Sequence, residues 1–195
     1  MKRKYDSSRR AASAARTRQA IIEATVRMHG KGITALSAVA HEAGVSLPTV
    51  NKHFPTREAL FGECTRHVAE NLDYPLPDEL AAIADRAERL HKVVWHVFTL
   101  HEKTFGQTWT GYKLEDESPV MASAMAGYEQ LTKSLADVLL RDQAAFAEVV
   151  RAMLSPLAYR ALRVKEGLDF ETAVAQTTSA LAKILDVSIP VSAHQ

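Results

Sequence analysis

The chain has 195 residues, 47% of them hydrophobic and 24% charged, a composition that permits a buried core and excludes a chain disordered throughout. Its single cysteine excludes an internal disulfide framework, and no apolar run approaches the roughly 20 residues of a membrane helix. Residues 1–67 hold 12 Lys and Arg against 5 Asp and Glu, a charge of +7, whereas residues 68–195 hold 12 against 18, a charge of −6. This split favours a polyanion-binding N-terminal part, although a solvated basic tail explains it equally well. No secretory signal is recognisable, so we expect a cytoplasmic protein.

Helical periodicity runs through the sequence without a strand-turn-strand pattern, so we predict an all-α protein. The first helix is expected over residues 14–29, with one apolar face formed by Ile21, Ala24 and Met28. It ends in the stretch HGKG, where Gly30 or Gly32 can adopt a left-handed cap.

Two short helices joined by a tight elbow are expected next. Thr34 is predicted to cap the first of them, which ends at Gly44, a residue free to take a positive φ. Ser46 is predicted to cap the second, over residues 47–53. Pro48 is tolerated in its first turn because the missing N–H would have no partner there. This layout is typical of a helix-turn-helix unit.

Pro55 ends that unit, and Thr56 is predicted to cap a longer helix over residues 57–72. The proline-broken segment 73–79 is the expected joint between two domains. Polar residues around Trp109 predict a loop over 106–119. Further helices are expected over residues 78–90, 91–105, 119–140, 144–165 and 169–185.

The segment 16–61 resembles the DNA-binding domain of the TetR family of transcriptional regulators. The resemblance rests on RTRQAIIEA, on VA and AGVS of the helix-turn-helix, on TREALF, and on Thr49 and Phe54. It implies a three-helix DNA-binding domain at residues 16–62 behind a basic arm at 1–15. It further implies a helical-bundle domain for effector binding and dimerisation at residues 63–195.

Two positions of the third helix differ from the usual family pattern. Pro48 stands where many members have glycine, and Asn51 stands where most have tyrosine. Asn51 can hydrogen-bond a phosphate or pair with adenine, while Leu47 and Pro48 can press on a thymine methyl group. We therefore expect a half-site that contains A·T pairs.

Base contacts are thus expected from Leu47, Pro48 and Asn51. Phosphate contacts are expected from polar and basic side chains and from free N–H groups at helix starts, with helix capping as a compatible role: Thr34, Ser37, Ser46, Thr49, Lys52, His53 and Arg57. For the basic arm, disorder and DNA contact are both open for Arg9, Arg10, Arg16 and Arg18.

Reading a palindrome requires two such units about 34–36 Å apart, and hence a dimer. The resemblance implies an interface built from the last two helices of each protomer. In the first of these helices, which Pro156 should kink, the apolar candidates are Val149, Val150, Met153, Leu154, Leu157 and Leu162. In the last helix the apolar stripe is Val174, Thr177, Leu181, Ile184 and Leu185.

The resemblance also implies a ligand pocket among the middle helices. The candidates by residue type, with ordinary core packing as the alternative for each, are Trp95, Phe98, Phe105, Trp109, Met121, Met125, Tyr128 and Tyr159. A metal site or other cofactor is not expected, because a five-residue spacing does not place three histidines on one helical face: His91, His96 and His101.

An enzyme is not expected, because the sequence holds no Gly-rich phosphate loop, nucleophile elbow or zinc-protease motif, and Cys64 lies on an apolar helix face. The favoured function is a dimeric repressor on a palindromic operator. A small apolar or amphipathic effector would release it by moving the recognition helices through the helix at 57–72. A small-molecule carrier or adaptor of the same fold, without operator binding, is the alternative.

Overall fold

The computed structural model describes residues 2–141 and 144–188, and every regular element in these ranges is a helix, which confirms the all-α prediction. The helices form two compact units. Unit 1 contains the residues up to 72 together with 104–125, and unit 2 contains 73–103 together with the residues from 126 onward. The functional division at residues 16–62 and 63–195 remains a prediction.

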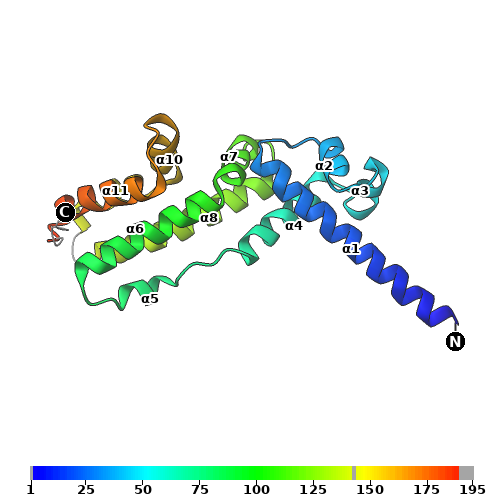
Figure 1. The fold of residues 1–195 in the computed structure, drawn as a ribbon, viewed down its shortest axis with the longest axis horizontal. Helices are drawn as coiled ribbons and strands as arrows, with labels where there is room; N and C mark the ends of the chain where they lie inside the picture. Colours follow the sequence, from blue (N-terminus) through cyan, green and yellow to red (C-terminus); the bar gives the residue numbers. More distant parts are fainter. Residues whose placement is uncertain (1, 142–143, 189–195) are drawn as a thin grey trace. The chain divides into compact units, whose positions relative to one another are not determined.

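Unit 1 is built on α1 (Lys2–Gly30), which begins well before the predicted residue 14 (Figure 1). No glycine or proline occurs between Lys2 and His29, and alanines at 11, 12, 14 and 15 favour a helix, so nothing ends α1 early. The predicted arm is therefore helical over its described residues. At the other end, Gly32 has a φ of +74°, as expected for one of the two candidate caps.

The next three helices follow the predicted order: α2 (Leu36–Glu42), α3 (Leu47–His53) and α4 (Arg57–Glu70). The positive φ of Gly44, 67°, and the cap of Ser46 on the N–H of Thr49 are confirmed. Thr56 likewise caps α4, at the N–H of Ala59. The cap predicted for Thr34 is wrong, because α2 begins one residue later than that cap requires and its N-cap, Ala35, has no side-chain oxygen.

A single apolar cluster holds α1 to α4 together. Its large, almost completely buried members are Ile21, Ile22, Val39, Val50, Phe54 and Leu60. Val39 and Phe54 are buried in this cluster, and Val45 is partly buried against it. Because Val50 and Phe54 lie at the middle and the end of α3, this cluster determines which face of α3 is turned outward.

The predicted loop at 106–119 is wrong, since most of it forms α7 (Phe105–Leu114). Its glycines allow close packing rather than a loop: a Cβ atom on Gly106 would lie 1.9 Å from the carbonyl oxygen of Gly30. From α7, the Thr110 hydroxyl donates to the carbonyl of His29 at 2.6 Å, and the Gln107 amide donates to that of Val26 at 3.5 Å. These bonds tie α7 to the last turns of α1, where the His29 carbonyl also accepts from the N–H of Gly32 at 2.9 Å.

Unit 2 differs from prediction in where its helices begin and end. The segments 78–90 and 91–105 form a short α5 (Pro77–Ala81) and a long α6 (Arg86–Lys103). α8 (Pro119–Asp137) begins in unit 1 and continues as η1 (Val138–Leu140). The remaining elements are η2 (Ala144–Phe146), α9 (Ala147–Met153), α10 (Pro156–Arg160), the π-helical η3 (Ala161–Lys165) and α11 (Phe170–Ile184).

The helix predicted over 144–165 is thus interrupted at Pro156. The prediction was a single helix with a kink at this residue. Ser155 accepts from the N–H of Ala158 and begins α10 anew, because a proline cannot continue the preceding helix but suits a first turn. The stripe predicted for a dimer interface on α11 is also corrected. Its members Val174, Thr177, Leu181 and Leu185 are buried within the protomer, where α11 packs on α6.

His101 joins three segments of unit 2. Its Nε2 donates to the carbonyl of Leu154 at 2.9 Å, which leaves Nδ1 of the neutral ring to accept from the Tyr128 hydroxyl at 2.7 Å. Burial lowers the pKa of His101 to about 4. Burial also lowers the pKa of His29 in unit 1 to about 4, and its Nε2 has no partner among the described residues.

Replacement of Gly106 by alanine should destabilise the protein, because the new Cβ would meet backbone rather than a movable side chain. The expected loss is about 1–3 kcal/mol of unfolding free energy, measured by urea titration. Gly127→Ala is the control: nothing lies within 4 Å of its Cβ position in α8, so it should stabilise by about 0.5–1 kcal/mol. Equal effects of the two changes would show that the Gly30–Gly106 approach is not tight.

The two buried histidines should make stability depend on pH. In the folded protein both pKa values lie below the usual 6.5. As pH falls from 6.5 towards 4, these histidines are therefore protonated in the unfolded chain while they stay neutral in the folded one. The free energy of unfolding therefore keeps its whole contribution from these histidines above pH 6.5. Below pH 6.5 it declines, by up to about 3 kcal/mol for each histidine.

Urea titrations at several pH values in this window would measure the decline. The pH slope should be smaller in His101→Gln, and it should be unchanged in His91→Gln, which alters an exposed histidine of α6. A slope that His101→Gln leaves intact would contradict the assignment.

Candidate functional site

α3 presents a polar and apolar outward face opposite its buried one. Val50 is fully buried, whereas Leu47 is 39% exposed and Pro48, Asn51 and Lys52 are also exposed. Among the described residues, the side chains of Asn51 and Lys52 make no hydrogen bond or ion pair. The three predicted base-contact residues and one predicted phosphate-contact residue thus share a face that is open to a partner.

The hydroxyl-bearing candidates at the start of α3 already serve the helix. Ser46 Oγ accepts from the N–H of Thr49 at 3.3 Å and lies 2.9 Å from the Thr49 hydroxyl. Each hydroxyl oxygen keeps further hydrogen-bonding capacity, so capping and phosphate contact are compatible. Ser37 is exposed on α2, while Thr34 before α2 and His53 at the end of α3 are half-buried.

Arg57, the last predicted phosphate contact, is already engaged within unit 1. Its guanidinium lies 3.8 Å from both Glu58 and Glu117 and stands over the ring of Phe61, 5.3 Å from the centroid. A phosphate would have to compete with two carboxylates for this side chain, unlike Lys52.

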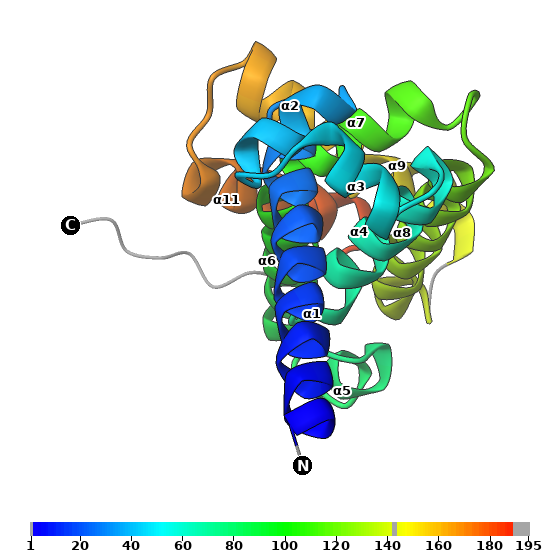
Figure 2. The same cartoon turned by 90° about the vertical axis from the view of Figure 1, so that its right-hand side faces the viewer.

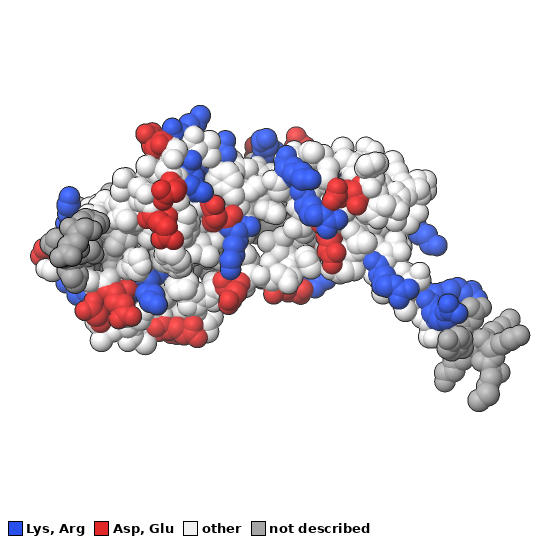
Figure 3. All heavy atoms as spheres, in the orientation of Figure 1, with Lys and Arg blue, Asp and Glu red and all other residues white. Residues whose placement is uncertain are grey.

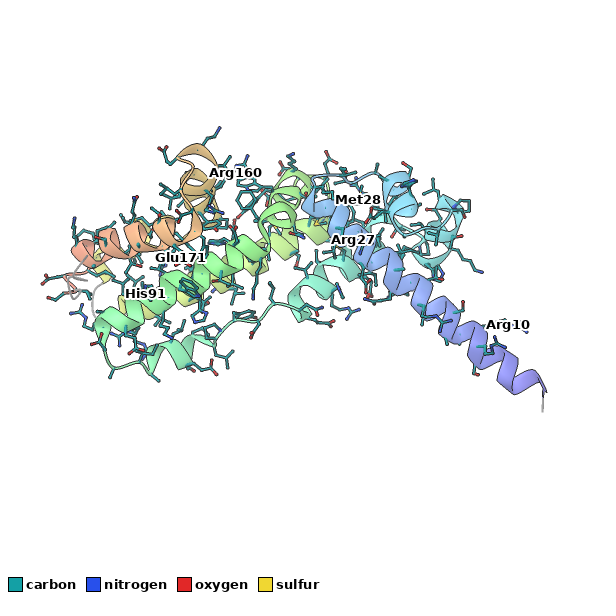
Figure 4. The ribbon with its side chains drawn as sticks, in the orientation of Figure 1. Arg10, Arg27, Met28, His91, Arg160 and Glu171 are labelled. Carbon is teal, nitrogen blue, oxygen red and sulfur yellow. The ribbon has the colours of Figure 1, made fainter. Side chains whose placement is uncertain are left out.

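The arginines predicted for the basic arm divide into two kinds. Arg18 bonds Glu63 at 3.1 Å and lies over the ring of Phe54, 4.8 Å from the centroid, so it serves the fold. Hydrogen bonds from Arg18 and Arg66 lower the pKa of Glu63 to about 2, which keeps it charged. Arg9, Arg10 and Arg16 are exposed, and Figure 4 shows Arg10 far along α1 from α2 and α3.

The first turn of α4 is bonded to the segment between α7 and α8. The buried Ser118 donates to Glu58 at 2.6 Å and accepts from the N–H of Met121 at 3.2 Å, which caps α8. Phe61 of α4 packs in one cluster with Leu114 and Met121. No local signal in the sequence points to this connection, because it joins residues about sixty positions apart.

Four of the predicted ligand residues lie in unit 2, and three of them surround His101. The ring of Tyr159 is 4.8 Å from that of Phe98 and 5.5 Å from that of His101, and Tyr128 bonds the same histidine. The fourth, Trp95, packs edge-on against Phe170 of α11 at 5.0 Å. Phe98 and Tyr159 are fully buried, whereas Trp95 and Tyr128 are partly accessible.

The other four predicted ligand residues lie in unit 1. Met121 is buried in the cluster with Phe61, and Met125 lies against Gly111, where an added Cβ would come 2.4 Å from its sulfur. Phe105 and Trp109 are half-buried on α7, and Trp109 packs against Tyr112 at 5.6 Å. The structure thus assigns the eight residues to two separate groups, one in each unit.

A charged group borders the aromatic cluster of unit 2. Glu102 accepts hydrogen bonds from the Tyr159 hydroxyl and, at 3.0 Å, from Arg163. The bond from Arg163, followed by that from Tyr159, lowers the pKa of Glu102, while burial and the carboxylate raise the pKa of Tyr159. The charge of Glu102 is therefore already paired with that of Arg163. A ligand at the aromatic cluster would be held mainly by apolar contacts.

Among the side chains that the structure describes, no three His, Cys, Asp or Glu residues are grouped as a metal site requires. Cys64 is buried, 3.9 Å from Nδ1 of His29, and burial raises the pKa of its thiol to about 12, so it stays protonated. None of the described helices has the combination of length and apolarity needed to cross a membrane.

Comparison with known proteins agrees with this geometry. Residues 21–64 match the family described as bacterial regulatory proteins, tetR family. The fold is similar to that of the multidrug binding protein EbrR complexed with imidazole, with 20% identity, a TM-score of 0.55, and coverage of 90% of this chain and 92% of the other.

It is also similar to that of the TetR-like transcriptional regulator LfrR from Mycobacterium smegmatis in complex with proflavine, with 21% identity, a TM-score of 0.54, and coverage of 87% and 96%. No curated protein is detectably similar in sequence. The helix-turn-helix at residues 21–64, which turns α3 outward, is thus similar to that of the tetR family of bacterial regulatory proteins, and the chain as a whole shares the fold of these two proteins.

Proposed function

We propose that the protein is a dimeric repressor that acts in the cytoplasm, binds a palindromic operator through α3, and leaves it when a small apolar or amphipathic effector binds. The observation that carries the proposal is the outward face of α3, where Leu47, Pro48, Asn51 and Lys52 are exposed while Val50 anchors the helix. A short helix held by one buried face and open on the other suits insertion into a major groove.

The chemistry of this face favours A·T pairs in the half-site. Asn51 can bond the N6 and N7 atoms of adenine, and the apolar surfaces of Leu47 and Pro48 suit a thymine methyl group. Lys52 and the helix-start residues Ser46 and Thr49 would hold the backbone without reading sequence.

Dimerisation is supported by exposed apolar side chains late in the chain. Four of them lie in the segment from η2 to η3, with exposures of 46%, 47%, 63% and 50%: Phe146, Val149, Leu157 and Val164. Such a group is costly on a solvated surface and suits an interface with a second copy. We therefore place the interface on this region and on the outer face of α11, in place of the buried stripe.

The effector is proposed to contact aromatic and methionine side chains, with the group around Tyr159 in unit 2 as its first candidate site. Apolar rings with a few polar atoms suit amphipathic molecules, and the two structural neighbours were solved with imidazole and proflavine. Effector binding would reach the DNA-binding helices through α4 and α8, whose first turns are joined to each other by Ser118 and Glu58.

The first test is selection of a random DNA duplex pool on the purified protein at low and moderate salt. We expect an inverted repeat with A·T pairs in each half-site. On the selected duplex, Lys52→Ala should weaken all sequences alike and reduce the salt slope of log K by about 0.9, because one phosphate is no longer neutralised. Asn51→Ala should cost about 1–3 kcal/mol and relax the preference at one position.

Fluorescence anisotropy over a range of KCl concentrations measures both effects, with Lys133→Ala in unit 2 as the control that should change neither. A half-site without any A·T preference would contradict the base assignments. Enrichment of no sequence, together with an affinity for DNA that does not depend on salt, would favour the carrier instead.

The effector prediction is tested with a panel of small aromatic and amphipathic compounds. Compounds that raise the melting temperature of the protein should also lower its affinity for the selected duplex, because they bind the released state better. Melting curves find the binders, and anisotropy titrations measure the change in operator affinity. Binders that leave operator affinity unchanged would remove the sensor part of the proposal.

A further inference from the structure

The ion pair between Glu102 and Arg163 lies at the edge of the aromatic cluster in unit 2. The carboxylate of Glu102 accepts from Nε of Arg163 at 3.3 Å and from Nη2 at 3.0 Å. The side chain of Glu102 is 44% exposed and that of Arg163 is 26% exposed, so water reaches both partners. An ion pair in contact with water is weak, and another cation can therefore exchange with the arginine.

Arg163 belongs to a segment that can move without opening the core. It lies in η3, a π-helical turn of a kind often found at functional sites, and none of the residues of η3 is buried. The segment from α10 to α11, orange in Figures 1 and 2, projects from the body of unit 2. Glu102, by contrast, belongs to the long α6 and follows the buried His101. The carboxylate is therefore the fixed partner of the pair, and the guanidinium is the movable one.

Hydrogen bonding within the cluster determines which ligand charge fits it. Tyr159 donates its only hydroxyl proton to Glu102. Tyr128 donates its own to His101, whose Nε2 proton is bonded to the Leu154 carbonyl. An anionic ligand would find these donors committed and would face a carboxylate. A cation would instead meet that carboxylate together with the negative faces of the aromatic rings, so the arrangement favours a ligand with positive charge.

This selection of charge is local to the cluster. On the face of unit 2 that Figure 3 draws, basic and acidic side chains are interspersed. No field of a single sign covers that face, so the attraction for a charged ligand would come from Glu102 at short range.

We propose that Arg163 occupies the position of a ligand cation on Glu102 in the free protein, and that an aromatic cation replaces it when it binds to the cluster around Tyr159. The ligand class is an aromatic ring system that carries an ammonium or amidinium group. Replacement would release η3 from α6, because the bonds between Arg163 and Glu102 join these two elements. The inference rests on the proposed effector site in unit 2, for which it names the ligand class and the first movement.

The test uses three naphthalene derivatives of nearly equal apolar area. These are naphthylmethylamine, which is a cation at neutral pH, the neutral naphthylmethanol and the anionic naphthoate. Isothermal titration calorimetry on the full chain measures the dissociation constant of each compound. The cation should bind about tenfold more tightly than the neutral compound, because it gains a charge-assisted hydrogen bond, and the anion should bind most weakly.

Two substitutions in the ion pair should act in opposite directions on the cation. Glu102→Gln should weaken its binding about tenfold and leave the neutral compound unchanged, because only the charge of the acceptor is lost. Arg163→Gln should strengthen its binding about two- to fivefold, because no guanidinium has to leave the carboxylate. Damage to the fold would weaken the cation and the neutral compound alike. The matched control is Glu88→Gln, which removes an exposed carboxylate about 21 Å away along the same helix and should change neither affinity.

Equal binding of the cation and the neutral compound, or a cation preference that survives Glu102→Gln, would overturn this inference alone. Weaker binding of the cation in Arg163→Gln would overturn it too, because the arginine would then assist the ligand rather than occupy its position. If the compounds bind with affinities that Tyr128→Ala leaves unchanged, they bind elsewhere and the proposed site in unit 2 fails first. That site also fails if none of the three compounds binds.

Discussion

The burial of one face of α1 is the constraint on which the DNA-binding part of the molecule depends. Ile21, Ile22 and Met28 provide the apolar surface against which α2, α3 and α4 pack. Val50 and Phe54 complete that surface from α3, so the direction of the outward residues follows from the core and not from the residues themselves. A short helix such as α3 would not be stable alone, and it is positioned only by this packing.

The local features of the helix-turn-helix could be predicted because they depend on neighbouring residues. Ser46, Thr56 and Gly44 act within one turn of their own positions, and each does what its residue type favours. The errors arise where distant residues decide. In the sequence Gly106 favours a loop, whereas in the structure it allows α7 to pack against Gly30. The apolar stripe of α11 was predicted to face a second protomer, whereas it packs on α6 of its own protomer. For the candidate site, the residues predicted to contact bases lie on the exposed face of α3, whereas the pairing of Arg57 with Glu117 could not be predicted because it requires the fold.

The proposed coupling between effector and DNA would depend on how unit 1 is assembled. α4 contributes Leu60 to the core with α1 and Phe61 to the cluster with α7 and α8, so adjacent residues face two different partners. A small rotation of α4 would disturb both clusters at once. The hydrogen bond between Ser118 and Glu58 sits at the same end of α4, and it joins the element that enters unit 2 to the first turn after the recognition helix.

Unit 1 is discontinuous along the chain, since residues 104–125 complete what residues up to 72 begin. On the ribosome, the DNA-binding helices therefore emerge before α7 and the start of α8 can cover Phe61 and cap the end of α1. A fragment cut after residue 72 would expose that aromatic surface and lose the bonds from Thr110 and Gln107. The helix-turn-helix is consequently not a module that can be transplanted at its sequence boundary, and any chimaera of this protein must carry the later segment with it.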